Sequence, residues 1–158
     1  QRVSELLAAA SELMAERGYE ATTMAEIASH AGARIGSLYR FFPNKEAVAD
    51  ALLQQNIAVL NDEYATLAKK ASELSLEDLT DVLIDFMTTQ YPRVKLLSAL
   101  MEARTDRMEI RNRSRQQALT GIAAALKTAA PQLDDETAKD IAAVTLNMMK
   151  VMRAMTMK

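Results

Sequence analysis

The stretch TTMAEIASHAGARIGSLYRFFPNK, residues 22–45, decides the fold of this chain. Thr23 followed by Glu26 forms a T-x-x-E capping box, in which each side chain satisfies a backbone amide of the first turn, so a helix begins near Met24. Gly32 can adopt the left-handed conformation that ends one helix and turns the chain into the next. The pattern predicts two short helices set at an angle, a helix-turn-helix, with Ile27, Leu38 and Phe42 spaced to meet beneath them.

The second of these helices, from Arg34 or Ile35 to about Phe42, carries side chains suited to a phosphate-lined groove. They are Arg34, Ser37, Tyr39 and Arg40. No acidic residue occurs between Glu26 and Glu46. The positive charge is therefore local, and it favours DNA as the partner of this helix.

Lys45 lies in the first turn of the helix that follows. A cation at this position opposes the helix dipole unless an anion shares the site. A DNA phosphate would supply that anion.

The longer stretch GYEATTMAEIASHAGARIGSLYRFFPNKEAV, residues 18–48, resembles the N-terminal domain of the TetR family of bacterial transcriptional repressors. The predicted DNA-contacting residues are Thr22, Thr23, Arg34, Ile35, Gly36, Ser37, Tyr39, Arg40 and Lys45; the resemblance places Thr23, Ser37, Tyr39, Arg40 and Lys45 at the family's DNA-contacting positions. Two residues depart from the family pattern: Arg34 stands where a Ser or Thr cap is common, and Phe41 where His or Tyr is frequent. The base sequence that this chain recognises therefore cannot be inferred from the operator of a relative.

Composition excludes several classes of function. The chain of 158 residues has no cysteine, which excludes disulfides and thiolate metal sites. Its single histidine gives poor support to Ser-His-Asp or Cys-His catalysis and to multi-histidine metal sites. No segment approaches the roughly 20 apolar residues of a membrane span. We predict a cytoplasmic protein that is not an enzyme and has no cofactor and no metal site. His30 is better explained as a solvated helix-end residue than as a ligand.

Apolar spacing predicts helices along the rest of the chain. Their expected ranges are 2–17, from Asn44 to about Ser72, from Ser75 to Tyr91, from Pro92 to about Arg104, from Asp106 to Ala130, and from Asp134 onward. Pro92 is expected to end one helix and open the next. We also expect the chain to continue beyond Lys158. The arginines between residues 104 and 115 alternate with acids, which favours a salt-bridged face over an anion site.

The last helix is apolar at nearly every turn from Ile141, so it must be covered on two sides, by its own body and by a second copy. The predicted interface residues are Ile141, Thr145, Met148, Met152 and Met155. A mainly apolar cavity is predicted in the body, lined by Tyr64, Phe86, Met87, Met101, Leu119 and Met148. A solid core remains the alternative.

The predicted fold is all-α: a helix-turn-helix DNA-binding domain over residues 1–45, joined by a long helix to a helical ligand-binding and dimerisation domain over residues 46–158. The resemblance implies a repressor that binds a palindromic double-stranded DNA operator as a homodimer and is released by a small apolar or amphipathic effector. The alternative is a helical small-molecule carrier or interaction module that does not bind DNA.

Overall fold

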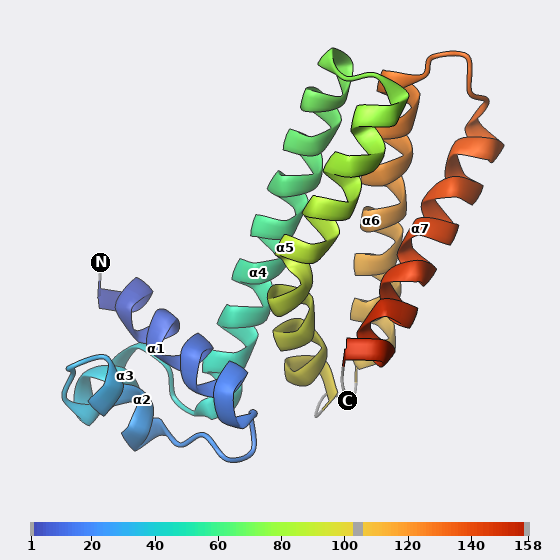
Figure 1. Ribbon diagram of the computed structural model, residues 1–158. Coiled ribbons are helices and arrows are strands. Elements are labelled where there is room, and N and C mark those ends of the chain that lie inside the picture. The colour runs from blue at the N-terminus through green and yellow to red at the C-terminus, as the bar shows by residue number, and fades with distance from the viewer. Residues whose placement is uncertain (1, 103–105, 157–158) are drawn as a thin grey trace. The chain divides into compact units, whose positions relative to one another are not determined.

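The computed structural model describes residues 2–102 and 106–156, except for the side chains of residues 102, 107, 149, 150 and 152–156. The described chain is all-α, as predicted, and contains no strand (Figure 1). Its helices are α1 (Arg2–Arg17), α2 (Met24–His30), α3 (Ile35–Phe41), α4 (Lys45–Lys70), α5 (Leu76–Glu102), α6 (Arg107–Ala129) and α7 (Asp135–Thr156), with a 3₁₀ turn at Ala71–Glu73. None of the described helices is both long enough and apolar enough to cross a membrane.

Local signals set the end of α1 and both ends of α2. Thr23 caps α2 in a complete capping box: its hydroxyl accepts from the Glu26 amide, and the Glu26 carboxylate accepts from the Thr23 amide. Gly18 and Gly32 have φ values of 85° and 58°, so each ends a helix in the left-handed region that glycine tolerates. The helix-turn-helix is therefore encoded locally.

The long helix α4 begins where Asn44 predicts it. The Asn44 side-chain oxygen accepts a 2.8 Å hydrogen bond from the Ala47 amide, which is an N-cap interaction. Ser75 caps α5 in the same way, through a 3.1 Å bond from the Asp78 amide.

The prediction of two separate helices meeting at Pro92 is wrong, because α5 continues through that residue. Proline removes one amide donor from a helix interior but does not force the chain to stop when packing holds both flanks. The apolar residues Leu96, Leu97 and Leu100 after Pro92 are buried, and their burial keeps the chain helical.

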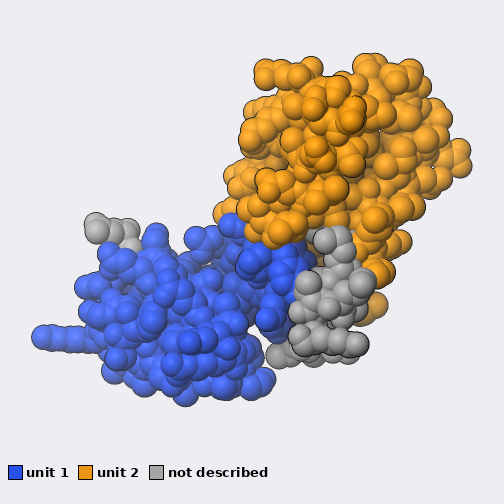
Figure 2. Space-filling view, in the orientation of Figure 1, with its two compact units in different colours: residues 1–57, 91–107 blue, residues 58–90, 108–158 orange. Residues whose placement is uncertain are grey.

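The chain forms two compact units, which Figure 2 colours separately. Unit 1 consists of residues 1–57 and 91–107, and unit 2 of residues 58–90 and 108–158. Each of α4 and α5 therefore contributes one part to each unit. This division follows packing within the chain; the predicted functional boundary at residue 45 stays a prediction.

The described residues of unit 1 include an apolar cluster under the helix-turn-helix. Ile27, Leu38 and Phe42 meet in it, as their spacing predicts. The other buried members come from α1, α2, α4 and the second half of α5: Leu6, Leu7, Ala10, Leu13, Met14, Met24, Ala28, Val48, Ala49, Leu52, Leu96 and Leu100. Packing against this cluster stabilises α2 and α3, which are too short to be stable as isolated helices.

In unit 2 the second half of α4, the first half of α5, α6 and α7 run side by side (Figure 1). The rings of Tyr64 in α4 and Phe86 in α5 are 5.1 Å apart, and Gly121 of α6 lies directly against Tyr64. Burial raises the pKa of Tyr64 to about 12, so this phenol is neutral at physiological pH. Arg113 and Glu109 form one of the predicted ion pairs along α6, at 3.6 Å.

Candidate nucleic-acid interface

Helix α3 presents nearly all of its side chains to solvent. Leu38 is its buried residue, whereas Ile35, Gly36, Tyr39 and Arg40 are exposed, Tyr39 by 50%. A seven-residue helix anchored by one leucine leaves the rest of its surface available to a partner. The local sequence supplies polar, aromatic and cationic groups there and no carboxylate.

Arg34 is the N-cap residue of α3 but makes no side-chain capping bond. The departure from a Ser or Thr cap thus leaves the first amides of α3 without a side-chain acceptor from that position, while the exposed guanidinium can reach an anion. At the other end of α3, the Arg40 guanidinium lies 5.0 Å from the centre of the Phe41 ring. Phe41 is 38% exposed, so it is not a core residue.

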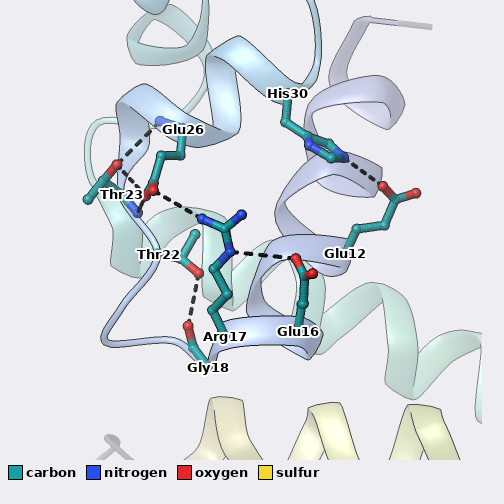
Figure 3. Close-up of polar contacts among 8 residues, drawn as sticks. All are labelled: Glu12, Glu16, Arg17, Gly18, Thr22, Thr23, Glu26 and His30. Atoms are coloured by element: carbon teal, nitrogen blue, oxygen red, sulfur yellow. Dashed lines mark hydrogen bonds and ion pairs between the residues drawn. The ribbon is translucent and has the colours of Figure 1, made fainter.

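Figure 3 shows the polar contacts that link α1 to α2. Arg17 lies between two carboxylates, 3.3 Å from Glu26 and 3.5 Å from Glu16. The hydroxyl of Thr23 donates to the Glu26 carboxylate, and this bond is the main reason that the pKa of Glu26 is lowered. These contacts join the end of α1 to the start of α2.

The predicted residue Thr22 lies away from the surface. Its side chain is 1% exposed, and its hydroxyl donates a 2.8 Å hydrogen bond to the Gly18 carbonyl (Figure 3). A side chain buried in this way cannot reach a DNA duplex, so we leave Thr22 out of the proposed contact set. Thr23, next to it, is exposed.

His30 is exposed at the end of α2, as predicted, and its Nε2 lies 2.7 Å from the Glu12 carboxylate of α1 (Figure 3). Among the described residues, no group of three or more acids and histidines is arranged to hold a metal ion.

The contacts of Lys45 could not be found from the sequence. Its ammonium donates to the Tyr19 carbonyl at 2.8 Å and to the Glu20 carbonyl at 3.2 Å, and it lies 4.3 Å from the centre of the Tyr19 ring. Tyr19 itself has a raised pKa, first because of burial and then because of the Glu46 and Glu20 carboxylates.

Comparison with known proteins agrees with this geometry. Residues 6–52 match the family described as bacterial regulatory proteins, tetR family. The chain is 38% identical over 93 residues to the HTH-type transcriptional repressor KstR2 of Rhodococcus jostii (strain RHA1), a match that covers 59% of this chain and 43% of that protein.

Residues 6–52 belong to the TetR family. The likeness in fold extends beyond this matched segment. A transcriptional regulator of the TerR/AcrR family from Aquifex aeolicus VF5 superposes with a TM-score of 0.71 at 17% identity, over 95% of this chain and 83% of that structure. FadR from Bacillus subtilis in complex with stearoyl-CoA gives 0.68 at 16% identity, over 98% and 89%. The chain spans less than half the length of its KstR2 relative.

The residues predicted for an effector cavity belong to both units: Met101 to unit 1, and Tyr64, Phe86, Met87, Leu119 and Met148 to unit 2. Met148 is 58% exposed. Phe86 does line an open groove of about 160 Å³ between α4 and α5, together with Leu67 and Val82 and the charged Glu63, Lys70 and Asp85.

The structure describes the side chains of three of the five interface residues predicted on α7. Ile141 and Met148 are exposed, Thr145 is half-buried, and the side chains of Met152 and Met155 lie outside the described residues. Two exposed residues that the prediction missed, Val144 and Val151, extend the same face. Their spacing from Ile141 and Met148 alternates between three and four residues, a signal that the sequence already contained.

Proposed function

We propose that this chain is a DNA-binding transcriptional regulator that acts as a repressor in the bacterial cytoplasm. The observation that carries the proposal is the exposed surface of α3, which presents Arg34, Ser37, Tyr39 and Arg40 beside a capped α2 and without a carboxylate. Its relatives include the repressor KstR2 over the same segment. Arg34 and Tyr39 would contact phosphates, and Ser37 and Arg40 would meet base edges.

The experiment that tests this function is selection from a random duplex library, followed by a titration with the enriched duplex. Wild type should bind it more tightly than a shuffled duplex, and Arg40→Ala together with Ser37→Ala should remove most of that preference. If wild type enriches no sequence and retards no duplex, the alternative of a carrier or interaction module is correct.

We propose further that the operator is palindromic because the protein binds it as a homodimer. The support is the exposed face of α7 formed by Ile141, Val144, Met148 and Val151. Apolar side chains repeated at three- and four-residue spacing form a continuous seam, and a second copy of the same helix would cover it. The enriched duplex should then contain inverted half-sites about 10 to 10.5 base pairs apart or at a multiple of this spacing.

The effector that we propose is a small amphipathic molecule. The groove beside Phe86 is lined by the apolar side chains of Leu67, Val82 and Phe86 together with two carboxylates and one ammonium. FadR, whose fold this chain shares, is described in complex with stearoyl-CoA, an amphipathic molecule. A thermal-shift screen of long-chain acids, their thioesters and aliphatic amines tests the chemical class of the effector. A compound that raises the melting temperature of wild type should not raise that of Phe86→Ala. A hit that shifts melting but leaves DNA affinity unchanged would contradict its role as an inducer.

A further inference from the structure

Phe41 is the last residue of α3, and 38% of it is exposed although phenylalanine is more often a core residue. The residue after it, Phe42, is buried in the apolar cluster of unit 1, and so is Leu38 in the preceding turn. The Phe42 amide donates a 2.9 Å hydrogen bond to the Leu38 carbonyl. The backbone at Phe41 is thus fixed by buried neighbours on both sides, and part of its aromatic ring lies on the surface.

The Arg40 guanidinium lies over this ring, with its central carbon 5.0 Å from the ring centre. The separation is within the range of about 6 Å over which a cation and an aromatic face attract each other. None of the ion pairs among the described residues includes Arg40. The sequence has no acidic residue between Glu26 and Glu46. Attraction to the Phe41 ring therefore restrains this guanidinium before any DNA arrives.

This restraint matters for recognition of a base. An unrestrained arginine samples many rotamers, and fixing it against a base edge costs conformational entropy. A guanidinium that already lies on an aromatic ring has lost part of that freedom in the free protein, so less is lost on binding. The ring has no oxygen or nitrogen acceptor, so the N–H donors of Arg40 remain available to DNA.

The donors of a guanidinium form a planar fork, and this fork suits two acceptors on the same base edge. In the major groove guanine presents two acceptors, O6 and N7, whereas adenine and thymine present one each and cytosine presents a donor. The Phe41 side chain has no hydrogen-bonding group of its own. Any hydrogen-bonded base reading at this end of α3 must therefore come from Arg40.

We propose that Phe41 is a positioning residue for base recognition, whose ring holds the Arg40 guanidinium in the orientation that reads a guanine. This inference rests on the proposed function, since it names a base that the DNA-binding surface selects. It is separate from the phosphate contacts of that surface, which position the protein without reading the sequence.

The test is a double-mutant cycle in the full chain, on the duplex recovered by the selection from the random library. The variants are Arg40→Ala, Phe41→Leu and the two together, because leucine keeps an apolar side chain and removes the aromatic face. Phe41→Tyr is the matched control, since it retains that face. Affinity is measured for the recovered duplex and for duplexes with one base pair replaced at a time. The ratio of the two affinities is the discrimination at each position.

Arg40→Ala should remove discrimination at one base pair of the recognised sequence, and that pair should be G·C. At the same pair Phe41→Leu should reduce discrimination by about 3- to 10-fold, whereas Phe41→Tyr should retain it. In the Arg40→Ala background, Phe41→Leu should cause no further change at that pair. The slope of the logarithm of affinity against the logarithm of salt concentration should be the same for wild type and Phe41→Leu, because the phosphate contacts are unchanged.

Discrimination that Phe41→Leu leaves intact, or lowers equally with and without Arg40, would overturn the positioning role. If Phe41→Leu instead loses a preference for thymine, the ring itself contacts the base methyl group and the inference is wrong. If circular dichroism shows that Phe41→Leu is unfolded, Phe41→Met replaces it under the same criteria. Wild type that binds no duplex would overturn the proposed function as well, whereas binding with discrimination independent of Phe41 would overturn this inference alone.

Discussion

Gly121 of α6 lies so close to Tyr64 of α4 that a Cβ on the glycine would stand 2.7 Å from the Tyr64 Cβ and 2.9 Å from its Cγ. Both tyrosine atoms sit next to the backbone, so they cannot move aside as the end of a flexible side chain could. Glycine is thus required here by close approach of two helices. Its own backbone has an ordinary helical conformation.

Gly121→Ala should therefore destabilise the protein by about 1 to 3 kcal/mol, through overpacking against Tyr64. Chemical denaturation of the full chain measures the change. Tyr64→Gly removes the Cβ with which the new methyl group collides, so Tyr64→Gly and Gly121→Ala together should cost less stability than the sum of their separate costs. Equal stability of wild type and Gly121→Ala would contradict the close contact.

Gly36→Ala should have the opposite effect on stability. Gly36 lies in α3, is exposed, and has no atom within 4 Å of the position of an added Cβ. Alanine should stabilise the head by up to about 1 kcal/mol through helix propensity. The added methyl group should nevertheless weaken DNA binding, because it stands on the surface proposed to approach the duplex. Chemical denaturation checks the expected gain in stability, and a duplex titration on the same preparation checks the expected loss of DNA affinity.

Thr23→Ala should cost about 1 kcal/mol of stability at neutral pH through loss of the capping box. The effect should depend on pH, because the Thr23 hydroxyl holds the pKa of Glu26 below its ordinary value. A lowered pKa in the folded state contributes stability above the unfolded-state pKa, and that stability is lost as the pH falls through the folded-state value. The difference between wild type and Thr23→Ala should thus shrink in acid. A Glu26→Gln variant should show a weaker pH dependence than wild type.

Val144→Glu combined with Met148→Glu should convert a dimer to monomers without unfolding the chain. Both side chains are largely exposed within one chain, by 59% and 58%, so the new charges are tolerated there but would be desolvated in the seam. Sedimentation velocity gives the size, and circular dichroism checks the fold. The matched control is Thr80→Glu with Thr88→Glu, two exposed positions on α5. If the dimer persists in Val144→Glu with Met148→Glu but is lost in Thr80→Glu with Thr88→Glu, the interface is on α5 and not on α7.

Pro92→Ala should stabilise α5 by roughly 1 to 3 kcal/mol, because alanine restores the amide that proline removes from the helix interior. Thermal unfolding measures the gain, with Lys95→Ala, an exposed position one turn away, as the control for helix propensity. Lower stability of Pro92→Ala than of the control would mean that the local packing depends on the proline ring.

The sequence by itself determined the elements whose signals are local. Thr23 with Glu26, Gly32 and Asn44 set the bounds of α2 and α4, because a cap or a glycine turn involves groups only a few residues apart. The spacing of Ile27, Leu38 and Phe42 likewise predicted which side chains meet under the helix-turn-helix.

Tertiary structure alone decided where distant segments meet. Helix α5 continues through Pro92 because leucines on its far side are buried, and local proline chemistry cannot foresee that burial. Thr22 and Lys45 resemble surface contacts in sequence, yet the loop after α1 buries the hydroxyl of one and binds the ammonium of the other. Polar side chains take whichever partner the fold brings within about 3 Å, and that partner lies as many as 26 residues away for Lys45.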